Sequence, residues 1–266
     1  MKYKLLAVDI DGTLLNSKGK LTKETKKIII KAIQNNVVFV ISTGRPIQGV
    51  ESLIDEIGFD LPFITYNGAM VVKGKSREVL YEKNLSRQDA QEVYNYGEKY
   101  NTTMIIWAKN KLYVNVINEK SREYSKLAST DLIKINRLKE IEDDITKILW
   151  YDDHSILENY QNELKVLLNN NIKNHFSRPY FLEFVDSNAT KAIAIEKLCD
   201  YFSISINETI AIGDGYNDLS MIKVAGLGVA MENAPQEIKD AAKYITTSCD
   251  KEGVANVIKK FILEDM

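Results

Sequence analysis

KLLAVDIDGTLL, residues Lys4 to Leu15, joins a short apolar run to two aspartates one residue apart. The run Leu5 to Val8 predicts a buried strand of a parallel sheet, because strands covered on both faces are continuously apolar. Residues two apart on an extended chain share a face, so Asp9 and Asp11 would leave this strand on the same side. Two carboxylates so close together are electrostatically costly unless a proton or a cation compensates them.

The composition is that of a globular protein larger than a usual single domain. The chain has 266 residues, 45% of them apolar, and a formal net charge of −2. No apolar run approaches the roughly 18 residues of a membrane helix, and Asp9 interrupts the N-terminal stretch too early for a secretory signal. We therefore expect a cytoplasmic protein, with neither nucleic acid nor membrane as a partner. The oligomeric state is not readable from the sequence.

Soft metal ligands are scarce in this chain. It has two cysteines, Cys199 and Cys249, and two histidines, His154 and His175, none of them clustered. This pattern disfavours a disulfide and a zinc site. A metal here would be a hard cation held by carboxylate oxygens.

A strand, a helix and a second strand follow in order at the N-terminal end. Thr22 is a plausible cap for a helix that ends near Asn35, and a strand at residues 37–41 comes next. This unit predicts two parallel strands joined by a right-handed crossover, so that Ser42 and Thr43 emerge at the same sheet edge as Asp9. Pro46 suits the first position of a following helix that runs to Ile57. A third strand at residues 63–66 and a hairpin spanning residues 70–81 complete this part.

The pattern changes in the middle of the chain and then returns. Between residues 84 and 186 the strands alternate apolar and polar residues and amphipathic helices separate them, which is typical of an antiparallel sheet with helices on one face. After Asn188, the expected cap of a helix at residues 189–202, a buried strand at 209–212 ends in Gly213-Asp214-Gly215-Tyr216-Asn217-Asp218. The sequence therefore predicts an α/β fold with a doubly wound parallel sheet, built from residues 1–83 and 188–266, and an α+β domain inserted at residues 84–187.

Polar side chains follow three strands of the expected sheet, where ligands of open α/β sheets bind. Four carboxylates converging there would repel one another, and a bound Mg²⁺, which takes a few carboxylates plus substrate phosphate, would relieve that cost. Phosphate oxygens could be held by the Thr43 hydroxyl, the Gly44 amide and the Lys191 ammonium. The strand ends carry Asp9 with Asp11, Ser42 with Thr43, and Asp214 with Asp218.

This arrangement suits phosphoryl transfer. One aspartate near the metal can attack phosphorus and form an acyl phosphate, while a second protonates the leaving oxygen and later activates water. Taken alone, Lys191 would usually be a solvated surface lysine and the acidic loops would be ordinary turns. Phosphate-binding P-loop and dinucleotide glycine patterns are incomplete in this chain. Trp107 and Trp150 are more typical of sheet packing than of base stacking.

These motifs resemble those of the haloacid dehalogenase (HAD) superfamily. The resemblance covers the whole expected core, whose HAD fold is Rossmann-like. The inserted domain looks like the cap of the Cof-type sugar phosphatases, as do the closing segments at residues 228–234 and 253–255. Ala192 departs from the pattern, since relatives often carry glycine after the lysine. The matching motifs are Asp9-Ile10-Asp11-Gly12-Thr13, Ser42-Thr43-Gly44-Arg45, Lys191, and the Gly213 to Asp218 loop.

The resemblance implies a role for each matched residue. Asp9 would be the phosphorylated nucleophile and Asp11 the general acid and base. Mg²⁺ would lie on Asp9, on Asp214 and on the main-chain carbonyl of Asp11, with Asp218 supporting the metal site. The phosphate group would be bound near Ile10, Thr43, Gly44, Lys191 and Asn217.

We therefore expect a Mg²⁺-dependent phosphatase that acts on small phosphorylated metabolites, with residues 84–187 as a cap that closes over the substrate. A phosphomutase and a non-catalytic phosphate-binding module remain as alternatives, whereas dehalogenase chemistry would have no use for the acid Asp11. The sequence does not identify the substrate. Asn115, His154 and Arg178 are polar candidates in the cap, although such residues more often lie on the surface.

Overall fold

The computed structural model describes residues 2–264, whose contacts form two units. The first unit contains the chain up to Thr43, residues 51–81 and the chain from Thr190 onward. The second contains residues 82–189 together with the short segment Gly44–Val50. The domain boundaries expected at residues 83/84 and 187/188 stay a prediction.

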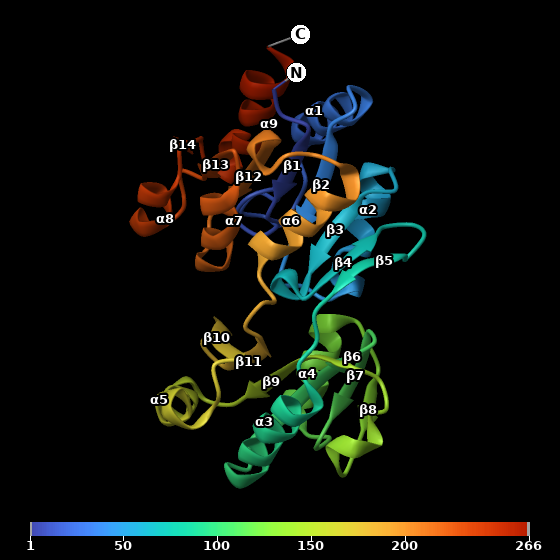
Figure 1. The fold of residues 1–266 in the computed structure, drawn as a ribbon, viewed down its shortest axis with the longest axis vertical. Coiled ribbons are helices and arrows are strands. Elements are labelled where there is room, and N and C mark those ends of the chain that lie inside the picture. Colours follow the sequence, from blue (N-terminus) through green and yellow to red (C-terminus); the bar gives the residue numbers. More distant parts are fainter. Residues whose placement is uncertain (1, 265–266) are drawn as a thin grey trace. The chain divides into compact units, whose positions relative to one another are not determined.

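The first unit is built on a sheet in which β1 is central. Within the described residues the sheet has eight strands in the order β14-β13-β12-β1-β2-β3-β4-β5 (Figure 1). The strands from β14 to β3 pair in parallel, whereas β4 pairs antiparallel with β3. Val8 pairs with Ile212 on one side and Ile41 on the other, so the ends of β12, β1 and β2 lie next to one another. The bounds are β1 Leu5–Val8, β2 Val38–Ser42, β3 Pro62–Thr65, β4 Met70–Lys73, β5 Val79–Glu82, β12 Thr209–Gly213, β13 Leu227–Ala230 and β14 Tyr244–Ile245.

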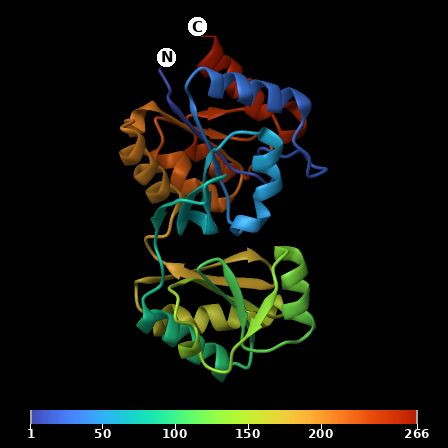
Figure 2. The same ribbon diagram turned by 90° about the vertical axis from the view of Figure 1, so that its right-hand side faces the viewer.

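Helices cover both faces of this sheet, as a continuously apolar β1 requires. Apolar residues of α6 and α7 pack on the face that carries Leu5 and Ala7. Helices α1, α2 and α9 lie on the opposite side of the sheet (Figure 2). The bounds are α1 Lys23–Gln34, α2 Glu51–Ile57, α6 Lys191–Phe202, α7 Leu219–Val224, α8 Gln236–Ala241 and α9 Gly253–Ile258.

Two helix starts differ from the sequence expectation. Pro46 does not open α2; it is extended and precedes a single 3₁₀ turn, and α2 begins only at Glu51. Helix α6 is capped by Thr190, whose hydroxyl accepts a hydrogen bond from the Ile193 amide, and not by Asn188. The Asn188 side chain instead donates to the Asp186 carboxylate. Asn ranks above Thr as a helix cap, so local preference pointed to the wrong one of these two positions.

The second unit contains a separate mixed sheet. Its order is β10-β11-β9-β6-β7-β8, antiparallel throughout except that β8 runs parallel to β7. Residues of α3 (Arg87–Lys99) and α5 (His154–Leu167) join the apolar core on one face, while Tyr124 of α4 (Glu119–Ala128) contacts Trp107. The α/β class and the additional sheet agree with the sequence prediction, although the short β8 and the edge strand β10 were not expected. The strands are β6 Thr103–Ala108, β7 Lys111–Val114, β8 Leu132–Lys134, β9 Ile145–Tyr151, β10 Ile172–Arg178 and β11 Phe181–Asp186.

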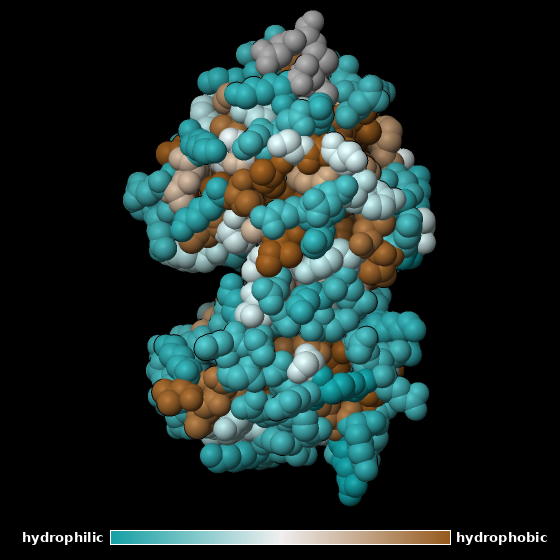
Figure 3. All heavy atoms as spheres, in the orientation of Figure 1, coloured by the Kyte–Doolittle hydropathy of each residue, from teal (hydrophilic) through white to brown (hydrophobic). Residues whose placement is uncertain are grey.

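The surface is dominated by hydrophilic side chains on the face that Figure 3 shows, with apolar residues scattered among them. Trp107 and Trp150 are fully buried in the second sheet, which agrees with the packing role expected for them. Among the helices of residues 2–264, none combines the length and the apolarity that crossing a membrane requires.

Candidate functional site

The loop after β1 presents two aspartates in different environments. Asp9 is buried, and its amide donates to the Ile212 carbonyl of β12, which draws Asp9 toward the loop that follows β12. Asp11 is exposed. Gly12, the residue after Asp11, has φ +79°, and a Cβ added there would lie 2.2 Å from Oδ2 of Asp214. The glycine is therefore required by both its backbone conformation and the close approach of Asp214.

Lys191 lies in the middle of this acidic group. It is the first residue of α6, it is 1% exposed, and its Nζ lies 2.6 Å from Oδ1 of Asp9 and 2.6 Å from Oδ1 of Asp218. The same ammonium donates to the Ser42 carbonyl at 2.9 Å. Lys191 is thus no solvated surface lysine. It joins the ends of β1, β2 and β12 into one site.

Three carboxylates outnumber the one ammonium in this site. Asp9, Asp214 and Asp218 each offer an oxygen, and these oxygens lie within 4.8 Å of one another. Burial, followed by repulsion from Asp218, raises the pKa of Asp9 to about 8. Burial likewise raises the pKa of Asp214 to about 6. The site therefore carries an excess of negative charge that favours the uptake of a proton or a cation.

The same carboxylates affect the pKa of Lys191, where they favour the charged form of the side chain. Burial alone would favour the neutral amine, but the adjacent carboxylates of Asp218 and Asp9 outweigh it and hold the pKa of Lys191 above its ordinary value. The side chain therefore stays a cation, and it can also neutralise charge on a bound phosphoryl group.

Asp218 shapes the loop in which Asp214 lies. Its Oδ2 accepts hydrogen bonds from the amides of Asp214 and Gly215 at 3.0 and 2.9 Å, and its Oδ1 accepts from Lys191. Both oxygens of Asp218 are thus engaged within the protein. Asp9 and Asp214 contribute the other carboxylate oxygens of the cluster, to which a cation could bind directly. A set of carboxylate oxygens with this excess charge fits a hard divalent ion.

The expected phosphate-binding residues occupy different positions around this centre. Thr43 is buried directly after β2, its amide donates to Ile64, and Gly44 is the next residue of the chain. Ile10 is fully buried, so that only its backbone could serve a ligand. Asn217 is exposed, and its Nδ2 donates to Oδ1 of Asn67 at 3.1 Å. Their binding roles stay predictions.

The sequence reading missed three residues that contact the site. Thr13 lies within the first motif, and its hydroxyl donates to Oδ1 of Asp214 at 2.9 Å. Asn233 donates to Oδ2 of the same carboxylate at 3.2 Å, although only its place in a closing segment pointed to it. Asn67 accepts a hydrogen bond from Asn217, and the positive φ of Tyr66 and Asn67, 52° and 56°, marks a strained loop.

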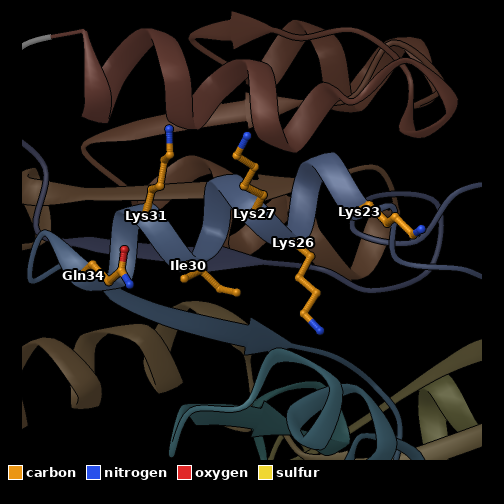
Figure 4. A pocket seen from close by; sticks show the side chains of 6 residues that line it. All are labelled: Lys23, Lys26, Lys27, Ile30, Lys31 and Gln34. Atoms are coloured by element: carbon orange, nitrogen blue, oxygen red, sulfur yellow. The ribbon is translucent and has the colours of Figure 1, made fainter.

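A basic hollow on α1 lies apart from these carboxylates in the first unit. Figure 4 shows its lining side chains, all from one helix and most of them lysines. The hollow contains no carboxylate, thiol or imidazole, so it offers no chemistry of its own. The lining residues are Lys23, Lys26, Lys27, Ile30, Lys31 and Gln34.

The polar candidates of the second unit have local partners. The Asn115 side chain accepts from the Met104 amide and donates to the Thr102 carbonyl, a pairing typical of a structural residue. His154 Nδ1 lies 2.8 Å from the Pro179 carbonyl oxygen, and Arg178 donates to the Tyr180 hydroxyl. Cys199 and Cys249, in the first unit, are both free thiols, as expected.

Comparison with known proteins places these features in context. A family model described as haloacid dehalogenase-like hydrolase matches residues 6–258. The Bacillus subtilis protein YxeH is 32% identical over 267 residues, which cover 98% of this chain and 99% of YxeH. The 5-amino-6-(5-phospho-D-ribitylamino)uracil phosphatase YcsE of B. subtilis is 31% identical, with 98% of this chain and 96% of YcsE covered.

A solved structure extends the similarity to the whole fold. The crystal structure of a haloacid dehalogenase-like hydrolase from Bacteroides thetaiotaomicron matches with a TM-score of 0.87 and 32% identity. The match covers 98% of this chain and 100% of that chain. Both the parallel sheet and the second sheet therefore have counterparts in a known architecture.

Proposed function

This chain belongs to the haloacid dehalogenase-like hydrolases, as a phosphatase of the Cof type, and from this premise we propose that it hydrolyses small phosphorylated metabolites by a Mg²⁺-dependent mechanism with a phosphorylated Asp9. One relative, YcsE, is named for such a compound, 5-amino-6-(5-phospho-D-ribitylamino)uracil. One observation carries the proposal: Lys191 contacts both Asp9 and Asp218, and the Asp214 carboxylate lies beside them.

The first step is attack on the ester. An oxygen of the Asp9 carboxylate forms a bond to phosphorus as the bond from phosphorus to the leaving oxygen breaks. Asp11, which is exposed, donates its proton to that leaving oxygen, so the alcohol departs neutral. Lys191 remains protonated beside Asp9 and stabilises negative charge on the transferred group.

The second step is hydrolysis of the acyl phosphate. The Asp11 carboxylate accepts a proton from water as the water oxygen bonds to phosphorus, and the bond between phosphorus and Asp9 breaks. Inorganic phosphate leaves, and Asp9 is again a carboxylate. Asp11 retains the proton for the next ester, so atoms and charges balance over the cycle.

The carboxylate cluster and the family resemblance together support an assignment of the residues that would hold the cation. We assign Mg²⁺ to Asp9, Asp214 and the main-chain carbonyl of Asp11. Asp218 would support this site by accepting a hydrogen bond from the Asp214 amide. When bound, this ion supplies positive charge opposite the phosphoryl oxygens and allows Asp9 to be ionised at neutral pH. The phosphate group would be bound by the Ile10 backbone, Thr43, Gly44, Lys191 and Asn217.

Residues 84–187 would act as the cap that selects the leaving group and limits the access of water during the reaction. A panel of phosphorylated sugars and cofactor intermediates, assayed for phosphate release, would identify the preferred class.

The test is turnover of p-nitrophenyl phosphate with MgCl₂. We expect Asp9→Asn to lower kcat by about a thousandfold or more, because the amide cannot form the acyl phosphate. Asp200→Asn makes the same chemical change on the exposed side of α6, where the side chain is 75% exposed, and should keep wild-type activity. Activity retained in Asp9→Asn would reject the mechanism.

Two measurements separate the alternative functions. A phosphomutase would need a bisphosphate activator and would release little inorganic phosphate. A non-catalytic phosphate-binding module would accumulate phosphorylated protein without turnover. Steady phosphate release without an activator supports the proposed hydrolase.

A further inference from the structure

The side-chain amide of Asn233 connects the loops that follow four adjacent strands. Asn233 itself follows β13, and its Nδ2 donates to the Gly12 carbonyl at 2.9 Å and to Oδ2 of Asp214 at 3.2 Å. Its Oδ1 accepts a hydrogen bond from the Cys249 amide at 3.2 Å. These partners follow β1, β12 and β14, and the sheet order β14-β13-β12-β1 makes all four strands neighbours.

These contacts fix the Asp214 carboxylate from two sides. Thr13 Oγ1 donates to its Oδ1 at 2.9 Å, and Asn233 donates to its Oδ2. Gly12 lies directly against the same group, since a Cβ there would be 2.2 Å from Oδ2. The torsion that turns a carboxylate about its Cβ–Cγ bond is broad, so hydrogen bonds decide the direction of its lone pairs. One donor on each oxygen leaves a single preferred orientation.

The loop that contains Cys249 has further anchors besides Asn233. Asn256 Nδ2 donates to the Thr247 hydroxyl and to the Lys251 carbonyl within the same segment. Glu232 accepts from the Ser248 amide and pairs with Lys251. Other side chains also anchor this loop, so we look for the effect of the Asn233–Asp214 contact at the Asp214 carboxylate itself.

We propose that Asn233 is a positioning residue which, together with Thr13, orients the Asp214 carboxylate and thereby sets the affinity of the site for its divalent cation. This inference rests on the proposed Mg²⁺ dependence. Neither residue touches the substrate in the proposed reaction. Their removal should therefore weaken cation binding and leave substrate binding at saturating Mg²⁺ nearly unchanged.

The expected loss of cation affinity can be taken from other proteins in which a residue that orients a metal ligand was removed. Loss of such a partner typically lowers metal affinity about 10- to 100-fold. We expect Asn233→Ala and Thr13→Val each to fall in this range, because each frees one oxygen of Asp214. Thr13→Ser keeps the hydroxyl donor and should bind the cation more tightly than Thr13→Val.

The experiment is isothermal titration calorimetry of the full chain with MgCl₂, in the absence of substrate, for wild type and these variants. Asn256→Ala is the matched control, since it removes a loop-anchoring amide without touching a carboxylate of the site. The MgCl₂ concentration for half-maximal turnover should rise about 10- to 100-fold in Asn233→Ala, while KM for p-nitrophenyl phosphate at saturating MgCl₂ stays within about twofold.

The outcomes separate this inference from the proposed function. If wild type binds Mg²⁺ and Asn233→Ala binds it within twofold, the positioning role is wrong and the proposed function stands. If wild type itself binds no Mg²⁺, the proposed metal dependence fails first, and the inference with it. Should Asn233→Ala fail to fold in the absence of metal, Thr13→Val decides the question, because it acts on the other oxygen of Asp214.

Discussion

Lys191 and Asp9 are 182 residues apart in the chain, and Nζ of one lies 2.6 Å from Oδ1 of the other. Both side chains are buried, and the ammonium also contacts Asp218. The contact connects the N-terminus of α6 with the end of β1, so the two halves of the core sheet share one charged centre. The stability of the fold and the chemistry of the site therefore depend on the same few groups.

Replacing Lys191 with methionine should destabilise the protein. The variant leaves the buried carboxylates of Asp9 and Asp218 without their cation, and breaking a buried ion pair from one side costs about 3–5 kcal/mol. Urea denaturation in EDTA measures this loss. Lys197→Met, on the same helix but with a side chain that is 51% exposed, should cost less than about 1 kcal/mol. Equal stability of the two variants would contradict the buried pairing.

The metal-free protein should become less stable as the pH rises toward 8. The pKa of Asp9 is raised to about 8 in the folded chain, so the folded state holds a proton that the unfolded state has lost. That contribution to stability is present at low pH and disappears as the pH rises through about 8. Because the pKa values of His175 and Asp214 are shifted as well, the measurement is the difference between wild type and Asp9→Asn, followed by thermal unfolding in EDTA. A difference that does not change between about pH 6 and pH 8.5 would contradict the shift.

Added MgCl₂ should stabilise the protein more at high pH than at low pH. Protons and the cation compete for the same carboxylates, since burial also raises the pKa of Asp214 to about 6. We expect the increase in Tm caused by MgCl₂ to be larger at about pH 8 than at about pH 5. NaCl at matched ionic strength is the control. An increase that is independent of pH would argue against cation binding at this cluster.

Gly68→Ala should disturb the position of Lys191, because Gly68, in the turn after β3, lies against the start of α6. Gly68 has φ +105°, and an added Cβ would lie 2.1 Å from the Thr190 carbonyl carbon, next to Lys191. Gly19 has a similar positive φ of +68° but open space around it, so Gly19→Ala reports the backbone strain alone, about 1–2 kcal/mol. We expect Gly68→Ala to cost clearly more in urea denaturation and to lower kcat. Equal effects of the two substitutions would show that α6 adjusts without cost.

The buried ion pair of the second sheet offers a double-mutant test. Lys147 Nζ lies 2.9 Å from Oε2 of Glu183, with side chains 2% and 6% exposed. Lys147→Met or Glu183→Met alone should cost about 3–5 kcal/mol by leaving an uncompensated buried charge, and the double variant should regain much of that loss. Chemical denaturation of the four proteins measures the coupling. Additive losses would mean that the pair is not coupled.

The sequence by itself determined those features that depend on neighbouring residues. Continuous apolar runs predicted buried parallel strands, and the short spacing of Asp9 from Asp11 and of Asp214 from Asp218 predicted carboxylates at strand ends. Lys191, by contrast, could be offered as a phosphate ligand from its charge, but nothing in its local sequence predicted that it would be buried between Asp9 and Asp218. Its own sequence context is that of an ordinary surface residue at a helix start, where the helix dipole disfavours a cation.

Tertiary structure alone decided which distant groups meet. Thr13 and Asn233 bind the same carboxylate of Asp214, and no local pattern encodes the contact of Thr13, which lies 201 positions from Asp214 in the chain. Helix α6 likewise begins after Thr190 and not after Asn188, although residue type favours asparagine as a cap, and Lys191 at its first position contacts Asp9. Local preferences act only between neighbouring residues, so the burial and pairing of charges across the sheet decide which distant groups meet.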